Sequence, residues 1–174
     1  LREPTELLTN ISLIPQTLTL ESYRNLLELT DYPTHFLNSV IVAVVSVVVT
    51  MVFSVMIAYA VTRQRIRGKK LIVGAMLYAY MFPPLLIAIP IFTIFARMGL
   101  SDTLTGLIVS HLTLTLPLGV WFLWGFFKSM PFELEEAAMV DGCTRLGAFV
   151  RVVLPLALPG LITVAIFSFL LSWT

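Results

Sequence analysis

Four apolar stretches, separated by short polar connections, dominate the pattern of this chain. They cover residues 36–62, 71–96, 104–127 and 158–174, and none of them contains Asp, Glu, Lys or Arg. A helix needs about 20 apolar residues to cross the hydrocarbon core of a bilayer, so the first three stretches predict complete membrane helices. The fourth is too short for a full crossing, and we expect the chain to stop in mid-helix. The pattern therefore predicts an all-α, polytopic membrane protein with one transmembrane domain over residues 1–174.

Prolines interrupt the second apolar stretch. Pro83, Pro84 and Pro90 lack the backbone N–H that a helix interior requires, so this stretch is expected to kink or unwind locally. Broken helices occur at membrane depth where they line a cavity or pack against protein. Both a packing kink and a break that lines a substrate pathway remain open.

Residues 1–35 form a polar, acidic segment before the first span. Thr19 is expected to cap a short helix that ends at Pro33, and the residues that give this helix one apolar face are Leu20, Tyr23, Leu26 and Leu27. Such a helix either lies on the membrane surface or contacts an external partner. The segment lacks the pattern of a secretory signal peptide.

A basic connection follows the first span. Arg63, Arg65, Arg67, Lys69 and Lys70 stand there without an acidic residue among them. Because Lys and Arg are enriched in cytoplasmic loops, this connection is predicted to face the cytoplasm. Residues 1–35 are then external, and residues 128–157 form a second cytoplasmic loop.

Composition agrees with the membrane assignment. Of the 174 residues, 58% are hydrophobic and 12% are charged, and the mean hydropathy is +0.95. Soluble domains usually carry about 25% charged residues. The net charge of +1 gives no sign of nucleic-acid binding. The single Cys143 excludes an internal disulfide framework and a cysteine-rich metal site, and no metal ligands are assigned.

The longest polar interruption, Glu133 to Gly160, predicts two short helices joined at a glycine. Ser129 is expected to cap the first helix near Pro131, and the first turn of that helix is acidic, where the helix dipole favours negative charge. Gly142 stands where a left-handed C-terminal cap is expected, and Thr144 is expected to cap the second helix.

The second helix is predicted to be amphipathic and to end at Pro155. Its apolar stripe has the i, i+3, i+4, i+7 spacing of one helical face: Leu146, Phe149, Val150 and Val153. A loop resting on the bilayer accounts for this helix but not for the acidic, alanine-rich first helix, because anionic leaflets repel acids. The residues alone thus favour the docking of another protein.

The run Glu136-Ala137-Ala138-x-x-Asp141-Gly142, followed by Leu154-Pro155, resembles the EAA loop of ABC importer permeases. Further runs resemble the carbohydrate-uptake branch, specifically the maltose-type second (G-type) permease: LTLESY at 18–23, Asn38-Ser39, AYA at 58–60 with Arg63, MGLSDT at 98–103, and FFKSMPFEL before the loop. Such permeases usually have about six membrane helices, and this chain supplies about four, so the resemblance implies an incomplete type I importer permease fold. Trp173-Thr174 departs from the usual Trp-Asn-Glu, which leaves the role of that asparagine open.

The resemblance implies a set of residues that couple the membrane helices to an ATPase: Glu133, Glu136, Ala137, Ala138, Asp141, Gly142, Leu146, Phe149, Leu154 and Pro155. It also implies a heterodimer with a second permease subunit, two ATP-binding subunits, an external substrate-binding protein or lipoprotein, and a sugar substrate. The expected location is the cytoplasmic membrane.

The sequence shows no enzyme motif. Gly68-Lys69 is not a phosphate-binding loop, because Arg63 occupies the position of the required earlier glycine. We therefore expect no cofactor in this chain, with ATP and Mg²⁺ held by a partner ATPase. The candidates for a substrate pathway are the polar and aromatic residues within or beside the spans: Asn38, Tyr59, Tyr78, Tyr80 and His111.

Three alternatives to a sugar importer permease remain open. They are an importer permease for another small solute, an ion-coupled secondary transporter, and a membrane scaffold without transport. A secondary transporter is expected to have intramembrane carboxylates, and the three complete spans have none. A scaffold leaves the acidic helix unexplained unless it binds some other protein.

Overall fold

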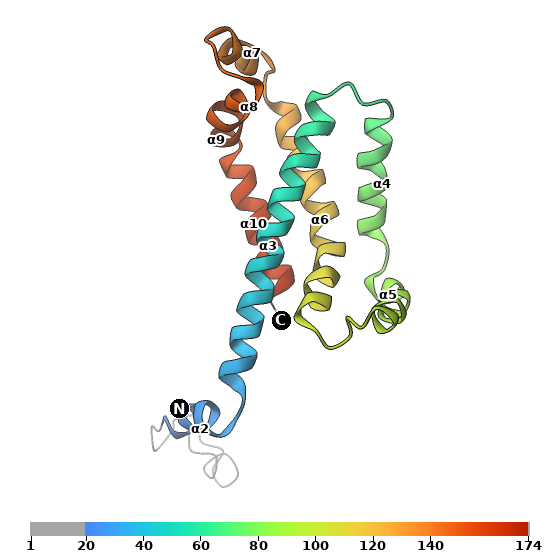
Figure 1. The fold of residues 1–174 in the computed structure, drawn as a ribbon, viewed down its shortest axis with the longest axis vertical. Coiled ribbons are helices and arrows are strands. Elements are labelled where there is room, and N and C mark those ends of the chain that lie inside the picture. The colour runs from blue at the N-terminus through green and yellow to red at the C-terminus, as the bar shows by residue number, and fades with distance from the viewer. Residues whose placement is uncertain (1–19, 174) are drawn as a thin grey trace, which may run out of the picture. The chain divides into compact units, whose positions relative to one another are not determined.

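The computed structural model describes residues 20–173, and every regular element in this range is helical. The elements, labelled as in Figure 1, are α2 (Glu21–Leu29), α3 (Tyr32–Arg63), α4 (Lys69–Met81), α5 (Pro84–Met98), α6 (Leu104–Ser129), α7 (Glu133–Val140), α8 (Arg145–Ala148), the π-helical turn η1 (Phe149–Val153), α9 (Leu154–Leu156) and α10 (Leu158–Ser172). Contacts divide the chain into one unit that ends at Ile41 and a second that begins at Val42. The expected all-α fold is confirmed.

The first unit contains the predicted amphipathic helix, α2. This helix ends at Leu29 with Thr30 as its C-cap, so the expectation that Pro33 ends it is wrong. Pro33 instead lies in the first turn of α3, where its missing N–H has no helical partner to lose. An exposed i, i+4 ion pair joins Arg24 to Glu28 on α2. The predicted cap, Thr19, lies outside the described residues.

In the second unit, α3 packs through a face of small residues. Ser46, Thr50 and Ser54 recur at every fourth position and are fully buried. Small side chains let helices approach closely in membranes. The hydroxyl of Thr50 lies 2.7 Å from that of Thr115 on α6, and a Cβ added to Gly119 on α6 would lie 2.5 Å from Ser54 Oγ. The contact between α3 and α6 therefore depends on residues without bulk.

The proline-rich stretch is broken as predicted. The chain leaves α4 at Phe82, which is extended like most residues before proline. It enters α5 at Pro84 after a bend of 95° between the two helices. Pro90 lies inside α5 without ending it. In Figure 1 the two helices are visibly angled to each other, with α4 beside α6.

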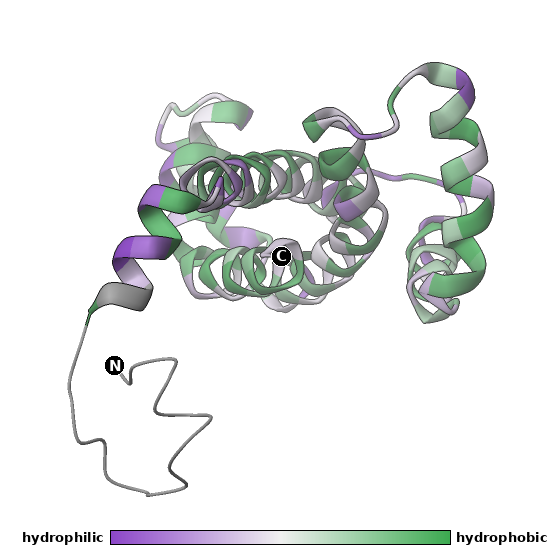
Figure 2. Cartoon of the chain, turned by 90° about the horizontal axis from the view of Figure 1, so that it is seen from below, coloured by the Kyte–Doolittle hydropathy of each residue, from purple (hydrophilic) through white to green (hydrophobic). Residues whose placement is uncertain are grey.

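α6 is the central element of the second unit, because α4 and α10 both pack against it. Thr103 caps its first turn by accepting a hydrogen bond from the Gly106 N–H at 3.0 Å. The helices α8 to α10 lead away from the polar loop and bend by 71° before α10. Figure 2, which colours the chain by hydropathy, shows hydrophobic residues along most of the helices, with hydrophilic residues mainly near the connections.

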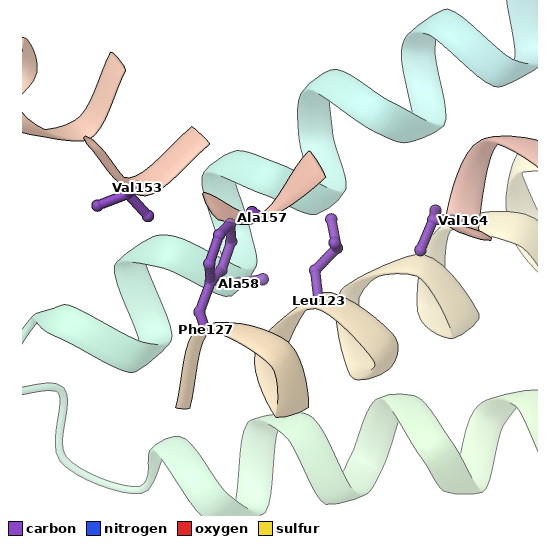
Figure 3. Packing of buried hydrophobic residues seen from close by; sticks show 6 residues of the cluster. All are labelled: Ala58, Leu123, Phe127, Val153, Ala157 and Val164. Carbon is purple, nitrogen blue, oxygen red and sulfur yellow. The ribbon is translucent and has the colours of Figure 1, made fainter. Parts of the chain in front are cut away.

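A compact apolar cluster holds α3, α6, η1 and α10 together where they approach the polar loop. Its fully buried members are Ala58, Leu123, Phe127, Val153, Ala157 and Val164. Figure 3 shows the Phe127 ring between the chain segments that carry Ala58 and Ala157. Burial of an aromatic ring among aliphatic groups contributes strongly to packing, so this cluster anchors the loop to the bundle.

Two helices of the described range, α3 and α6, are long and apolar enough to cross a membrane. The total rises to as many as four if α4 with α5, and α8–α9 with α10, each count as one bent crossing. These numbers follow from the length and apolar composition of the helices.

Candidate functional site

The polar segment after α6 folds into a small group of helices at one end of the second unit. In Figure 1, α7, α8 and α9 lie at the same end as the turn from α3 to α4. α7 packs against α8 and η1, so the two halves of the segment form one structure. This end of the molecule holds the residues expected to couple to an ATPase.

The first turn of α7 is acidic, as the sequence suggested, with Glu133, Glu135 and Glu136 near the positive end of the helix dipole. Its N-cap is Phe132, which makes no side-chain cap. The prediction that Ser129 caps this helix is wrong, because α6 continues through Ser129. The Ser129 hydroxyl donates instead to the Phe126 carbonyl within α6, at 2.7 Å.

A left-handed glycine joins the two halves of the loop. Gly142 has φ of +89°, and its N–H donates to the Met139 carbonyl at 3.1 Å. Thr144 then caps α8 by accepting from the Gly147 N–H at 3.1 Å. Both predictions are confirmed. Glycine suits position 142 because the Cβ of any other residue disfavours the left-handed backbone conformation.

The second helix differs from the expected single amphipathic helix. It consists of α8, the π-helical turn η1 and α9, and a π-helical turn has more residues per turn than an α-helix. The predicted stripe is only partly buried: Val153 is buried and Phe149 half-buried, whereas Leu146 is 72% and Val150 51% exposed. The helix also runs through Pro155 to Leu156, so the expected end at Pro155 is wrong.

The outer surface of the loop combines carboxylates with exposed apolar groups. Glu133, Glu136 and Asp141 are exposed beside Ala137, and Val140 is 87% exposed. Ala138 is half-buried behind them, as is Leu154, while Gly142 and Pro155 are exposed. A surface that offers negative charge, a small alanine and an uncovered valine is suited to a protein partner. We call Glu133, Glu136, Ala137, Val140 and Asp141 the α7 surface.

The opposite side of α7 is fixed by a buried ion pair. Arg63, the last residue of α3, is in direct contact through Nε with Oε1 of Glu135, although the two atoms are not aligned as a hydrogen bond. Their side chains are 6% and 2% exposed. The second carboxylate oxygen, Oε2, accepts a hydrogen bond from the Tyr59 hydroxyl at 2.9 Å. Both oxygens of Glu135 thus have a partner on α3.

Arg63 also binds the chain that leads into α7. Its Nη1 and Nη2 atoms lie 3.4 and 3.3 Å from the Met130 carbonyl, to which they donate. The guanidinium carbon lies 5.4 Å from the centre of the Phe132 ring, a cation–π distance. Removal of one partner from a buried ion pair costs about 3–5 kcal/mol, because the other charge stays buried without compensation. The α7 surface is therefore backed by a support that is costly to break.

Aromatic packing extends this support into the bundle. The Tyr59 ring lies 4.4 Å from that of Phe149 and meets the ring of Phe127 edge-on at 6.2 Å. Phe127 belongs to the apolar cluster of Figure 3. The polar loop and the membrane helices thus form one packed structure.

The prediction of coupling residues omitted Arg63 and Glu135. A signal for Glu135 was available, because Phe132, Glu135, Ala138 and Met139 have the spacing of one helical face. A carboxylate within an otherwise apolar face requires a buried partner. Which of the basic residues supplies that partner depends on the tertiary fold.

The proposed pathway residues lie in different environments. Tyr59 is bonded to Glu135 at the α7 end. Tyr78 is 77% exposed and Tyr80 is half-buried on α4, while His111 is half-buried on α6. Asn38 is half-buried and belongs to the first unit. A role of these residues in substrate passage stays a prediction.

Among residues 20–173, no group of three or more His, Cys, Asp or Glu side chains is placed to hold a metal ion. Within the same range, the loop offers contacts for another protein through exposed carboxylates and apolar groups.

Comparison with known proteins decides the family. The profile described as "Binding-protein-dependent transport system inner membrane component" matches residues 50–174, which include all of the polar loop. The chain belongs to this family. As an inner-membrane component with several apolar helices, this permease is a multi-pass protein of the cytoplasmic membrane. The family resemblance stated from the loop sequence is thereby confirmed.

Two relatives illustrate the similarity. The permease is 39% identical over 171 residues to the trehalose transport system permease protein SugB of Mycobacterium tuberculosis (strain CDC 1551 / Oshkosh), covering 98% of this chain and 62% of SugB. It is 38% identical over 168 residues to the diacetylchitobiose uptake system permease protein NgcG of Streptomyces coelicolor (strain ATCC BAA-471 / A3(2) / M145), covering 97% of this chain and 56% of NgcG. The chain thus spans less than two thirds of either relative's length.

A solved structure shares the fold. It is a chain of a bacterial ABC transporter involved in the import of the acidic polysaccharide alginate, with a TM-score of 0.84 and 25% sequence identity. The match covers 99% of this permease and 60% of that chain. The expected permease fold is confirmed, with the permease supplying part of the length of its structural relative.

Proposed function

We propose that the chain is a transmembrane subunit of an ATP-driven importer for a sugar or oligosaccharide, and that its α7 surface binds an ATP-binding partner subunit. The observation that carries this proposal is the pairing of two opposite faces on α7. One face exposes Glu136 and Val140 to a partner, while the other fixes Glu135 in a buried ion pair with Arg63. Such a helix receives a contact and transfers its movement to the membrane helices.

The α7 surface defines the chemistry of the partner's docking site. Exposed carboxylates favour a basic rim, and Val140, which is 87% exposed, favours an apolar hollow. Ala137 allows the partner's backbone to come close, because its side chain is a single methyl group. ATP and Mg²⁺ would be held by that partner, which supplies the hydrolysis.

Charge supports a cytoplasmic position for this surface. Arg65 and Arg67 are exposed on the turn from α3 to α4, and Lys70 is exposed in the first turn of α4. This turn lies at the same end as α7. Positively charged connections concentrate on the cytoplasmic side, and ATP is available there. Residues 1–35 would then be external, where an extracellular substrate-binding protein or lipoprotein delivers the solute.

The relatives support a sugar as the substrate. SugB and NgcG carry names that refer to trehalose and diacetylchitobiose, and the structural relative is a chain of a transporter involved in the import of the polysaccharide alginate. The remaining subunits would be a second permease subunit, with this chain in the G-type position of the heterodimer, and a pair of ATPases. The solute would pass between the two permease subunits.

The proposed cycle is alternating access. Closure of the ATP-binding subunits moves the α7 surface, and the attached helices rock between outward-facing and inward-facing states. A ligand or partner shifts such an equilibrium only if it interacts differently with the two states. The ATPase must therefore contact α7 differently before and after it binds ATP.

Co-purification of the full-length protein with its ATPase tests the docking proposal. Glu136→Lys together with Ala137→Arg places positive charge and bulk on the α7 surface and should abolish co-purification. Thr105→Lys, an exposed change in the first turn of α6 away from the loop, is the control and should retain it. Retention of the ATPase by the Glu136 and Ala137 variant would exclude this docking surface.

Transport assays separate the remaining alternatives. In proteoliposomes that contain the whole complex and its binding protein, disaccharides should stimulate ATP hydrolysis and accumulate inside. Stimulation by amino acids alone would identify an importer for another solute. Accumulation driven by an ion gradient without ATP would identify a secondary transporter and overturn the proposal.

A further inference from the structure

Three side chains link α3 to α7 on the side of α7 opposite the α7 surface. Arg63 and Tyr59 come from the last turns of α3, and Glu135 comes from the buried face of α7. The carboxylate has Arg63 on one oxygen and Tyr59 on the other. Both oxygens of the Glu135 carboxylate therefore face residues of α3.

We infer that Tyr59, Arg63 and Glu135 are positioning residues that make α7 and the end of α3 move as one rigid body. We call these residues the α3–α7 latch. The inference rests on the proposed function, because it assigns the route by which movement of the α7 surface reaches the membrane. The latch itself touches neither solute nor nucleotide.

Burial makes this connection effectively indivisible. The Arg63 and Glu135 side chains are 6% and 2% exposed, so separation of α7 from α3 would break the ion pair and open the packed junction that encloses both charges. Arg63 simultaneously holds the Met130 carbonyl, which lies in the connection from α6 to α7. One guanidinium thus secures both the helix and the chain that enters it.

The exit from the loop is built differently. Between α7 and α10 the chain passes through the π-helical turn η1 and a bend of 71°. The buried groups on this route, Val153 and Ala157, make apolar contacts. Apolar surfaces can slide over one another by small amounts in shear motions, whereas a buried charge pair cannot be divided without exposing a charge. Movement of α7 is therefore transmitted directly to α3 and through a bend to α10.

Tyr59 has a defined part in the latch. Its ring packs against the rings of Phe149 and Phe127, and its hydroxyl donates a hydrogen bond to Glu135 Oε2. This hydrogen bond satisfies the carboxylate oxygen that Arg63 does not contact. The tyrosine was a candidate for the substrate pathway, and the latch gives it a different role that can be tested separately.

The test compares uptake with ATP hydrolysis in the full complex. Glu135→Gln and Arg63→Gln each remove one charge of the pair and leave the α7 surface unchanged. We expect co-purification and ATP hydrolysis to persist, while solute imported per ATP hydrolysed falls by about 2- to 30-fold, the usual range for changes within a coupling network. Arg65→Gln, which removes an exposed charge two residues away from Arg63, is the matched control and should keep the wild-type ratio.

Two further variants distinguish positioning from folding. The exchange Arg63→Glu with Glu135→Arg restores opposite charges and should recover part of the lost uptake per ATP. Tyr59→Phe keeps the ion pair and removes one hydrogen bond, so it should fold and show a smaller loss than Glu135→Gln. If Glu135→Gln does not fold, the ratio measured for Tyr59→Phe decides the question.

The outcomes are separable from those of the proposed function. Wild-type ratios of uptake to ATP hydrolysis in Glu135→Gln, Arg63→Gln and Tyr59→Phe, with the complex intact, would overturn the latch and leave α7 docking in place. Failure of the unmodified protein to bind any ATPase would instead overturn the proposed function.

Discussion

Replacement of Gly142 by alanine isolates the backbone geometry of the loop from its side-chain contacts. Gly142 has φ of +89°, and a Cβ there meets no atom within 4 Å. The substitution therefore adds no clash, and its effect is the strain of an L-residue in the left-handed region, about 1–2 kcal/mol. The turn either retains its shape at this cost or relaxes and alters the angle between α7 and α8.

Gly99 provides a matched control within the same chain. It has φ of +69° at the C-cap of α5, and an added Cβ is again free of neighbours within 4 Å. Gly142→Ala and Gly99→Ala should therefore lower the midpoint of thermal unfolding by similar amounts, about 2–8 °C for a strain of this size. Only Gly142→Ala should also lower solute uptake per ATP hydrolysed, because only Gly142 connects the two halves of the coupling loop.

The assay uses the purified complex in proteoliposomes, with uptake and ATP hydrolysis measured on the same preparation. Gly142→Glu extends the series by adding bulk and charge, and it should abolish uptake while part of the assembly persists. Equal losses of uptake per ATP in Gly142→Ala and Gly99→Ala would refute the reasoning, since the loss would then follow general stability. Normal uptake in Gly142→Glu would equally contradict a coupling role for the turn.

Three further predictions concern the contacts that hold the site together. Glu135→Gln should lower the free energy of unfolding by about 3–5 kcal/mol, whereas Glu28→Gln, in the exposed ion pair of α2, should change it by less than about 1 kcal/mol; equal thermal shifts would contradict the difference in burial. Gly119→Ala should destabilise by about 1–3 kcal/mol through overpacking against Ser54, and Ser54→Ala should relieve part of this in a double-mutant cycle, so additive effects would exclude the contact. Thr144→Ala should cost about 1 kcal/mol through loss of the α8 cap, and an unchanged unfolding midpoint would show that the cap is dispensable.

The two long apolar helices, α3 and α6, could be predicted because the bilayer imposes a simple length requirement on charge-free segments. The break after Met81 followed from the missing N–H groups of Pro83 and Pro84, and the structure confirms it. Gly142 and Thr144 were also predictable, because a helix cap depends on residues close in sequence. These features are local, so the sequence around each one contains its cause.

Features that depend on distant contacts were missed. Glu135 lies on an apolar face of α7, but its partners Tyr59 and Arg63 belong to α3 and are brought near only by the fold. The π-helical turn also escaped prediction, because an i, i+3, i+4 pattern assumes α-helical geometry throughout. Ser129 was assigned to the wrong helix because its hydroxyl can bond backward into α6 as well as forward.

The central claim is that the α7 surface is seated on an ATP-binding subunit. Site-directed crosslinking in the full complex tests it most directly, with Cys143→Ser removing the native thiol of this chain. Ala137→Cys, an exposed change on α7, should form an adduct with the ATP-binding subunit, in a yield that changes when ATP is bound. Thr105→Cys, exposed on α6 away from the loop, should form none. Absence of the Ala137→Cys adduct, or its formation with Thr105→Cys alone, would contradict the account.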